Sequence, residues 1–198
     1  MERLMETKLL DFNLDKSGAI VFGSKKAKEK VECEMRQFPL TLCGKKMKLF
    51  EQEKYLGETI SSEGLEASVW ATIYRRKGLA IASIFDIRSI VEDCRSSVIG
   101  GILTGLEIWE LAVIPFLLNN CETWSNMSNK AMTELDKIQE TFYRTLLSTP
   151  KTCPIPALYW DTGGMTMKHR IACRKLAFYH HLMNLPHDTL AYEIAMTQ

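Results

Sequence analysis

Two stretches of the sequence combine side chains that could contact phosphate groups. Arg75-Arg76-Lys77 lies in a segment with helical periodicity, and Lys54-Tyr55 precedes a Leu-Gly pair. Arg75 and Arg76 fall outside the apolar stripe of their segment. We therefore expect both to face solvent and to follow a nucleic-acid backbone by charge, without base specificity. A charge run of this kind is also typical of a solvated helix face, and that alternative stays open.

Acidic side chains are the second group that could do chemistry. Phosphoryl transfer by a polymerase needs two magnesium ions held by clustered carboxylates. The nearest candidates are Asp11 and the pair Glu92-Asp93. We expect Asp11 at a helix end and Glu92-Asp93 at a helix N-terminus, where the dipole favours negative charge. The sequence shows no Gly-rich phosphate loop and no recognisable Ser-His-Asp spacing. We expect no catalytic residue here.

Metal ligation and disulfide chemistry are weakly supported. His169, Cys173 and His180 suggest a metal, but their spacing does not resemble a zinc knuckle. The six cysteines are scattered without a CxxC pair, and the first residues are charged rather than signal-like. We expect reduced thiols, no bound metal, and a nuclear or cytoplasmic rather than secreted protein.

The overall composition is typical of a globular protein. Of 198 residues, 46% are hydrophobic and 25% charged, and the formal charge is +1. Because that charge is close to neutral, a nucleic-acid contact must depend on a local cluster. Residues 98–118 are the most apolar stretch, but Glu107, Glu110 and Pro115 interrupt it. We expect a buried core helix there and no membrane contact.

The first sixty residues predict a small sheet after a short helix tail over residues 1–11. The run 19–22, closed by Gly23, predicts a strand. Residues 24–36, dominated by Lys and Glu, predict a solvated loop. Residues 40–42 and 47–49 alternate apolar and polar side chains around Cys43-Gly44-Lys45-Lys46, which predicts a hairpin. Tyr55-Leu56 with Ile60 predicts a third strand. Together these strands predict a small antiparallel sheet over residues 19–60.

Helical periodicity dominates after Gly64. The first expected helix has Trp70, Ile73, Ile81 and Ile84 in its stripe, and the second covers residues 98–118 and stops near Pro115. The third is capped by Ser128 and buries Leu135, Ile138, Phe142 and Leu146. The fourth covers residues 165–184 and buries Met167, Ile171, Phe178 and Leu182. Between the last two, residues 155–160 predict a short turn closed by Gly163-Gly164. The fold class is therefore α+β, with modules over 1–62 and 63–198.

Four segments in this order resemble one protein family. Asn13, Lys16 and Ser17 match an "N-x-x-K-S/T" turn that leads into the strand 19–23, and Lys54 to Gly57 match a "F/Y-K-Y-L-G" motif. Downstream, the segment 115–124 is similar to "P-x-L-x-Y-G-x-E-x-W". A further helix over residues 135–150 also fits. The chain resembles the C-terminal part of the reverse transcriptase of non-LTR (LINE-type) retrotransposons: the end of the palm, the primer grip, the thumb and the connector.

This resemblance implies a contact with an RNA/DNA template-primer duplex. In the family, the Tyr-Leu-Gly strand is the primer grip, which assigns primer contact to Lys54, Tyr55, Leu56 and Gly57. Lys16 corresponds to a lysine near the phosphates of the incoming nucleotide. The family's "F/Y-x-D-D" signature does not occur in this sequence. The resemblance therefore implies a truncated polymerase that is inactive alone and needs no cofactor, whereas an intact relative uses Mg²⁺.

The chain departs from the family at several motif positions. Glu53 replaces the usual aromatic, and Asn119-Asn120 replace an aromatic and a glycine. An alternative reading is an inactive or host-adopted helical protein that acts through protein–protein contacts. The apolar side chains that favour it are Trp109, Phe116, Leu117, Leu118 and Trp124. An exposed sheet edge could add self-association.

Overall fold

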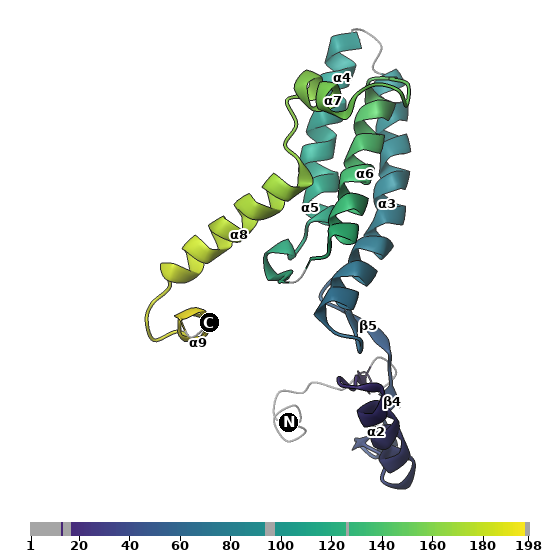
Figure 1. Cartoon of the computed structure of the whole chain (residues 1–198), viewed down its shortest axis with the longest axis vertical. Coiled ribbons are helices and arrows are strands. Elements are labelled where there is room, and N and C mark those ends of the chain that lie inside the picture. Colours follow the sequence, from purple (N-terminus) through teal and green to yellow (C-terminus); the bar gives the residue numbers. More distant parts are fainter. Residues whose placement is uncertain (1–12, 14–16, 94–97, 126, 197–198) are drawn as a thin grey trace. The chain divides into compact units, whose positions relative to one another are not determined.

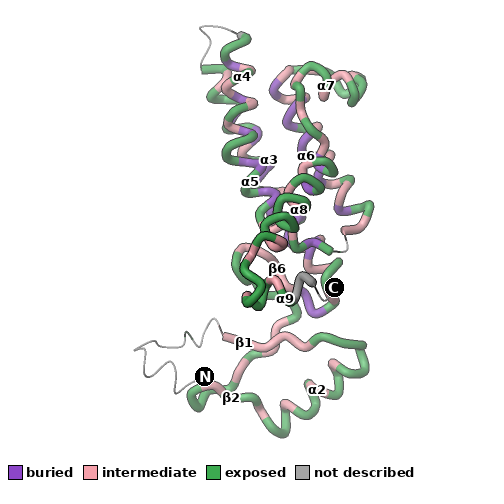
Figure 2. Tube along the Cα trace, turned by 90° about the vertical axis from the view of Figure 1, so that its left-hand side faces the viewer, coloured by how far each residue is buried: buried purple, intermediate pink, exposed green. Residues whose placement is uncertain are grey.

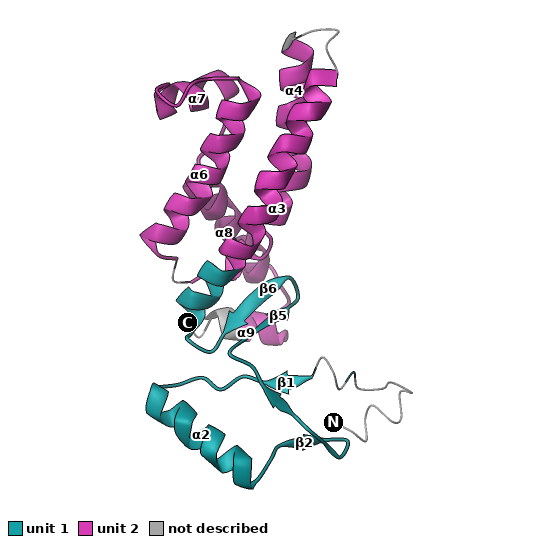
Figure 3. Ribbon diagram, turned by 90° about the vertical axis from the view of Figure 1, so that its right-hand side faces the viewer, with its two compact units in different colours: residues 1–71 teal, residues 72–198 magenta. Residues whose placement is uncertain are grey.

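The computed structural model describes residues 13, 17–93, 98–125 and 127–196 (Figure 1). The chain divides into two compact units, Met1–Ala71 and Thr72–Gln198 (Figure 3). The boundary falls inside helix α3 (Leu65–Asp93). The structure is 65% helical with small two-stranded sheets, which confirms the α+β fold class.

The described strands of unit 1 form separate pairs instead of one sheet. Strand β1 (Gly18–Ala19) pairs in parallel with β4 (Lys48–Leu49), while β2 (Thr41–Leu42) and β3 (Lys45–Lys46) form an antiparallel hairpin, as do β5 (Gln52–Tyr55) and β6 (Glu58–Ser61). A hairpin that turns at Cys43-Gly44 is confirmed, but its second strand is Lys45–Lys46. The expected second arm, residues 47–49, is wrong, because Lys48–Leu49 pairs with β1 instead. The single antiparallel sheet is wrong, because each short strand bonds to one neighbour and one pair is parallel. Residues 20–22 continue beyond β1 without strand pairing.

Helix α2 (Lys25–Gln37) occupies the segment expected to be a loop. The Ser24 hydroxyl accepts a hydrogen bond from the Ala27 backbone N–H at 3.3 Å, which caps the helix. Lysine, glutamate and methionine are strong helix formers, so propensity and a cap suffice without an apolar stripe. No residue of α2 is buried, and Figure 2 shows it exposed or half-buried throughout.

Unit 2 begins with residues 72–93 of α3, the long helical stretch 98–117, and α6 (Asn129–Leu146), and further helices follow. Figure 2 shows buried positions along these helices. Gly105 on α4 (Val98–Ile108) permits the close packing: a Cβ there would lie 2.5 Å from Leu146 Cδ1. Trp109 stacks on Phe142 with ring centroids 4.1 Å apart. Glu92 and Asp93 end α3, so their expected place at a helix N-terminus is wrong.

Pro115 does not stop the second helix. A π-helical turn (Trp109–Val113) precedes it, and α5 (Ile114–Leu117) continues the helix. The Ile114 N–H donates to the Trp109 carbonyl, five residues earlier. Because proline has no N–H and its ring crowds the preceding turn, an α-helix cannot pass it unchanged. Here the backbone widens by one residue just before the proline.

The expected ends and core positions of the later helices are mostly confirmed. The Ser128 hydroxyl caps α6, whose four expected core residues are all buried. Helix α7 (Ile155–Thr162) ends at Gly163 in the left-handed conformation. Helix α8 (Met167–Met183) buries Met167 and Ile171, but Phe178 is 41% exposed, so its expected burial is wrong. Leu182 is half-buried, and α9 (Leu190–Met196) follows.

One apolar stretch in the described residues, Ile99–Leu117, is long and apolar enough to cross a membrane by length and composition. A single stretch of this kind is weak evidence, because core helices share these properties. Only 28% of it is buried. The expectation of a buried core helix is therefore wrong for part of its surface, where Ile99, Leu103 and Leu111 are exposed.

Candidate nucleic-acid interface

The Tyr-Leu-Gly motif forms the end of one strand and a tight turn. Tyr55 closes β5 opposite Glu58, and Leu56-Gly57 is the two-residue loop between them. Leu56 has φ 48° and Gly57 φ 87°, both in the left-handed region. Positive φ at both loop residues is what a type I′ hairpin requires, and glycine adopts it without strain whereas leucine does not. The expectation that Leu56 and Ile60 extend one strand is wrong, because the chain reverses between them.

The side chains at this turn are presented to solvent. Lys54 is exposed, and Tyr55 and Leu56 are 63% and 75% exposed. The Lys54 backbone N–H bonds to the Glu53 carboxylate at 3.0 Å. An exposed ammonium beside an exposed aromatic ring is the combination that proteins use to hold a phosphate and stack a base.

A hollow of about 700 Å³ joins this hairpin to the preceding turn motif. Its polar residues are Ser17, Glu53, Lys54 and Tyr55. The apolar residues that line it are Ile20, Leu42, Met47, Phe50 and Ile60. The Ser17 hydroxyl donates to the Asn13 carbonyl at 2.8 Å. Ser17 from the first motif and Lys54-Tyr55 from the second therefore share one concave surface within unit 1. Lys16 and Asp11 lie outside the described residues.

Arg76 does not face solvent, so the expectation for this arginine is wrong. Its side chain is 1% exposed, and its Nη1 donates to the carbonyls of Leu117 at 3.1 Å and Asn119 at 2.8 Å. The guanidinium also lies 5.9 Å from the centroid of Trp124. The last carbonyls of a helix lack intrahelical donors, and a cation there also complements the dipole. Arg75 is half-buried.

The spacing of the α3 residues could have revealed this burial. The buried apolar positions are Val69, Ile73, Ala80, Ile84 and Ile87, separated by three, four or seven residues. That stripe includes position 76. Choosing Trp70 and Ile81 as stripe members, which are both half-buried, rotates the predicted face and places the arginine outside it.

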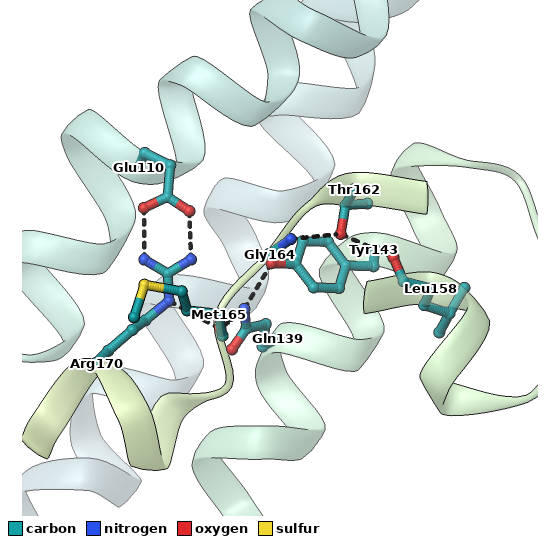
Figure 4. Close-up of polar contacts among 8 residues, drawn as sticks. All are labelled: Glu110, Gln139, Tyr143, Leu158, Thr162, Gly164, Met165 and Arg170. Carbon is teal, nitrogen blue, oxygen red and sulfur yellow. Dashed lines mark hydrogen bonds and ion pairs between the residues drawn. The ribbon is translucent and has the colours of Figure 1, made fainter. Parts of the chain in front are cut away.

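Three basic residues of α8, Arg170, Arg174 and Lys175, are likewise engaged within unit 2. Arg170 donates to both carboxylate oxygens of Glu110, at 2.6 and 2.5 Å, and its Nε bonds to the Met165 carbonyl at 3.1 Å (Figure 4). Arg174 donates to the Leu118 carbonyl at 3.2 Å, and Lys175 donates to the Trp124 carbonyl. Arg76, Arg174 and Lys175 therefore all donate to backbone carbonyls at the end of α5 and in the segment that follows it.

A buried polar network fixes the segment before α8. The Gln139 amide donates to the Tyr143 hydroxyl at 2.6 Å and to the Met165 carbonyl at 2.8 Å. Figure 4 shows these groups converging on the chain between Thr162 and Met165. Burial opposes the charge of Arg170, but the ion pair with Glu110 outweighs it and raises the pKa of the guanidinium. The Gln139 bond to the Met165 carbonyl ties α6 to the segment before α8, and Glu110 compensates the charge of Arg170.

Acidic groups of α6 have shifted proton affinities. Hydrogen bonds from Lys77 and Lys137, at 2.7 and 2.9 Å, lower the pKa of Glu134 to about 2. Burial raises the pKa of both Asp136 and Glu140. These carboxylates belong to packing between helices. Within the described ranges, no three His, Cys, Asp or Glu side chains are grouped to hold a metal.

The side chains that favoured protein–protein contact mostly form the core. Trp109, Leu117, Leu118 and Trp124 are at most 2% exposed, so their expected role at a surface is wrong; Phe116 alone of that set is partly accessible, at 40%.

Comparison with known proteins gives no matching family model, no matching curated protein and no matching solved structure.

Proposed function

We propose that this chain is the C-terminal part of a non-LTR retrotransposon reverse transcriptase and that its β5–β6 hairpin contacts the primer strand of an RNA/DNA template-primer duplex. The observation that carries the proposal is the shared hollow of Ser17, Lys54 and Tyr55, which brings two separate sequence motifs together in unit 1. Lys54 supplies a charge for a backbone phosphate, and Tyr55 supplies a ring for a base or sugar.

The proposed function does not include catalysis. The "F/Y-x-D-D" signature does not occur in the sequence. That carboxylate pair is what holds the two magnesium ions in a polymerase. We therefore propose a gripping role, in which the duplex is held by charge and stacking.

The test is fluorescence anisotropy of a labelled RNA/DNA primer-template at several salt concentrations. Loss of one stacked base contact costs about 1–3 kcal/mol, so Lys54→Ala/Tyr55→Ala should weaken binding roughly tenfold or more. It should also reduce the slope of log affinity against log salt by about one. Lys168→Ala/Tyr179→Ala is the matched control, since both residues are exposed on α8. Equal losses in both double variants would refute the assignment.

A second function, contact with another protein, is favoured by the exposed apolar residues of α4 and the π-helical turn. Ile99 is 72% exposed, Leu103 55% and Leu111 80%. Apolar side chains gathered on one helical stretch are typical of interaction surfaces. Sedimentation velocity over a range of concentrations tests it: self-association that Leu103→Gln/Leu111→Gln abolishes would support this function, and a concentration-independent monomer that captures no partner would count against it.

A further inference from the structure

A second hollow, in unit 2, has a lining suited to anions. It has a volume of about 460 Å³ and lies where α6 ends, facing a residue near the end of α3. Its cations are Arg88, Arg144 and Lys151, and the other lining residues are Ser148 and three threonines. The lining therefore contains neither a carboxylate nor an apolar side chain, although acidic and basic residues are almost equal in number along the chain. We call this surface the α6-end hollow.

Arg144 is held in place with its charge preserved. Its Nη1 donates to the Pro150 carbonyl at 2.8 Å and its Nη2 to the Cys153 carbonyl at 2.9 Å. These contacts use two of the five N–H donors of a guanidinium and do not neutralise it. A guanidinium fixed in this way matches the geometry of phosphate oxygens and loses little side-chain entropy on binding.

The remaining charges decide whether the hollow favours an anion. Arg88 is paired with Glu92 at 2.8 Å, so it contributes little. Glu140 lies one turn before Arg144 on α6, and the carbonyl end of the helix adds roughly half a negative charge. Lys151 is exposed and lines the hollow as a further cation. The cations could therefore serve only to complement the helix end, and a further observation is needed.

Ser148 supplies that observation. It follows the last turn of α6 and has φ 51°, the left-handed conformation in which helices usually place glycine. Serine is strained at this position, whereas glycine would not be. Its side chain is exposed and lines the hollow beside the cations. The chain thus places a hydroxyl donor at this point at a cost in stability. Cations that only neutralised the end of the helix dipole would not need this hydroxyl.

We propose that the α6-end hollow binds a phosphate group, held by the Arg144 guanidinium, the Lys151 ammonium and the Ser148 hydroxyl. The volume also accommodates the sugar attached to such a phosphate. The phosphate could belong to a nucleic-acid backbone or to a small phosphorylated molecule. The inference does not depend on the function proposed for the β5–β6 hairpin, because the two sites share no residue.

The test is a titration of the full chain with inorganic phosphate, followed by ¹H–¹⁵N NMR, against sodium chloride at equal ionic strength. We expect saturable shifts of the backbone amides around residues 144–151 with phosphate and none with chloride. Lys151→Ala should weaken the affinity several-fold, and Lys168→Ala, an exposed lysine outside the hollow, should leave it unchanged. Absence of saturable shifts in the wild-type chain would overturn the proposal.

Ser148→Gly separates binding from folding. Glycine relieves the backbone strain, so the Tm should rise, while the phosphate affinity should fall by about threefold to tenfold through loss of the hydroxyl. A higher Tm with unchanged phosphate affinity would overturn the role of Ser148 and with it the proposal.

A second arm adds a single-stranded oligonucleotide. Shifts of the same amides at lower concentration than inorganic phosphate would identify a nucleic-acid backbone as the ligand, and shifts with phosphate alone would identify a small phosphorylated molecule. Lys54→Ala/Tyr55→Ala should leave the phosphate shifts intact, so the two proposals can fail separately.

Discussion

Replacing Arg76 by alanine should destabilise the protein strongly. The side chain is buried and donates to the Leu117 and Asn119 carbonyls, at 3.1 and 2.8 Å, and lies over the Trp124 ring. The Leu117 carbonyl is buried, and leaving it without a donor costs about 1–3 kcal/mol; the part-buried Asn119 carbonyl can bond to water instead and costs less. The lost cation–π contact adds about 0.5–2 kcal/mol. Water that enters the vacated space recovers part of this sum, so we expect a net loss of about 3–5 kcal/mol.

Urea unfolding followed by tryptophan fluorescence measures this loss, because Trp109 and Trp124 are buried. Arg88→Ala is the matched control on the same helix: its ion pair with Glu92 is about half exposed, so its removal should cost under about 1 kcal/mol. Arg76→Lys should lie between the two, since an ammonium keeps the charge but not the guanidinium geometry. A loss below about 1 kcal/mol for Arg76→Ala would refute the reasoning.

The result also affects how binding assays are interpreted. A double variant of Arg75 and Arg76 would lower the affinity for nucleic acid by unfolding unit 2, whether or not either residue touches a phosphate. Substitutions at exposed Lys54 and Tyr55 avoid this ambiguity, because removing exposed side chains usually changes stability by less than about 0.5 kcal/mol.

Three further experiments test the packing and the charges of unit 2. Gly105→Ala places a methyl group 2.5 Å from a packed leucine and should cost about 1–3 kcal/mol, whereas Gly78→Ala on α3 meets nothing within 4 Å and should stabilise by up to about 1 kcal/mol; urea unfolding compares them. The pKa of Glu134 is lowered from its ordinary value of 4.5 to about 2 in the folded protein. The ionised carboxylate therefore stabilises the fold fully above pH 4.5, and this contribution is lost as the pH falls from 4.5 toward 2. The difference in unfolding free energy between wild type and Glu134→Gln, about 1 kcal/mol near neutral pH, should therefore vanish in that window, and a constant difference would contradict the assignment. A double-mutant cycle with Glu110→Gln and Arg170→Met should give a coupling of about 1–2 kcal/mol, and a value near zero would show that the bidentate pair contributes nothing.

Helix ends and amphipathic faces could be predicted where a cap and a regular stripe agree. Helix α6 combines the Ser128 cap with core residues at helical spacing, and α7 ends at a glycine that adopts positive φ. Helix α2 was missed because it has a cap and good propensity but no apolar stripe. Its charged residues are compatible with either a loop or an exposed helix, and the Ser24 cap together with helix propensity favours the helix.

The candidate site depended on tertiary contacts that local patterns do not encode. Motif spacing singled out Lys54 and Tyr55, but not that the chain reverses at Leu56-Gly57 or that Ser17 lies on the same hollow. The burial of Arg76 was not predicted, because the predicted stripe of α3 contains Trp70 and Ile81. The buried residues are instead Val69 and Ala80, each one position earlier. For a long helix with apolar residues on several sides, the periodicity alone does not decide which face is buried.

Site-specific photo-crosslinking tests the central claim most directly. A benzophenone amino acid in place of Tyr55, mixed with a primer-template labelled separately on each strand, reports which strand lies beside the β5–β6 hairpin. The account predicts a crosslink to nucleotides at the 3′ end of the primer that weakens at high salt, and none from the same group in place of the exposed Tyr179. Crosslinks of equal yield from both positions, or none from position 55 at low salt, would contradict the proposed primer contact.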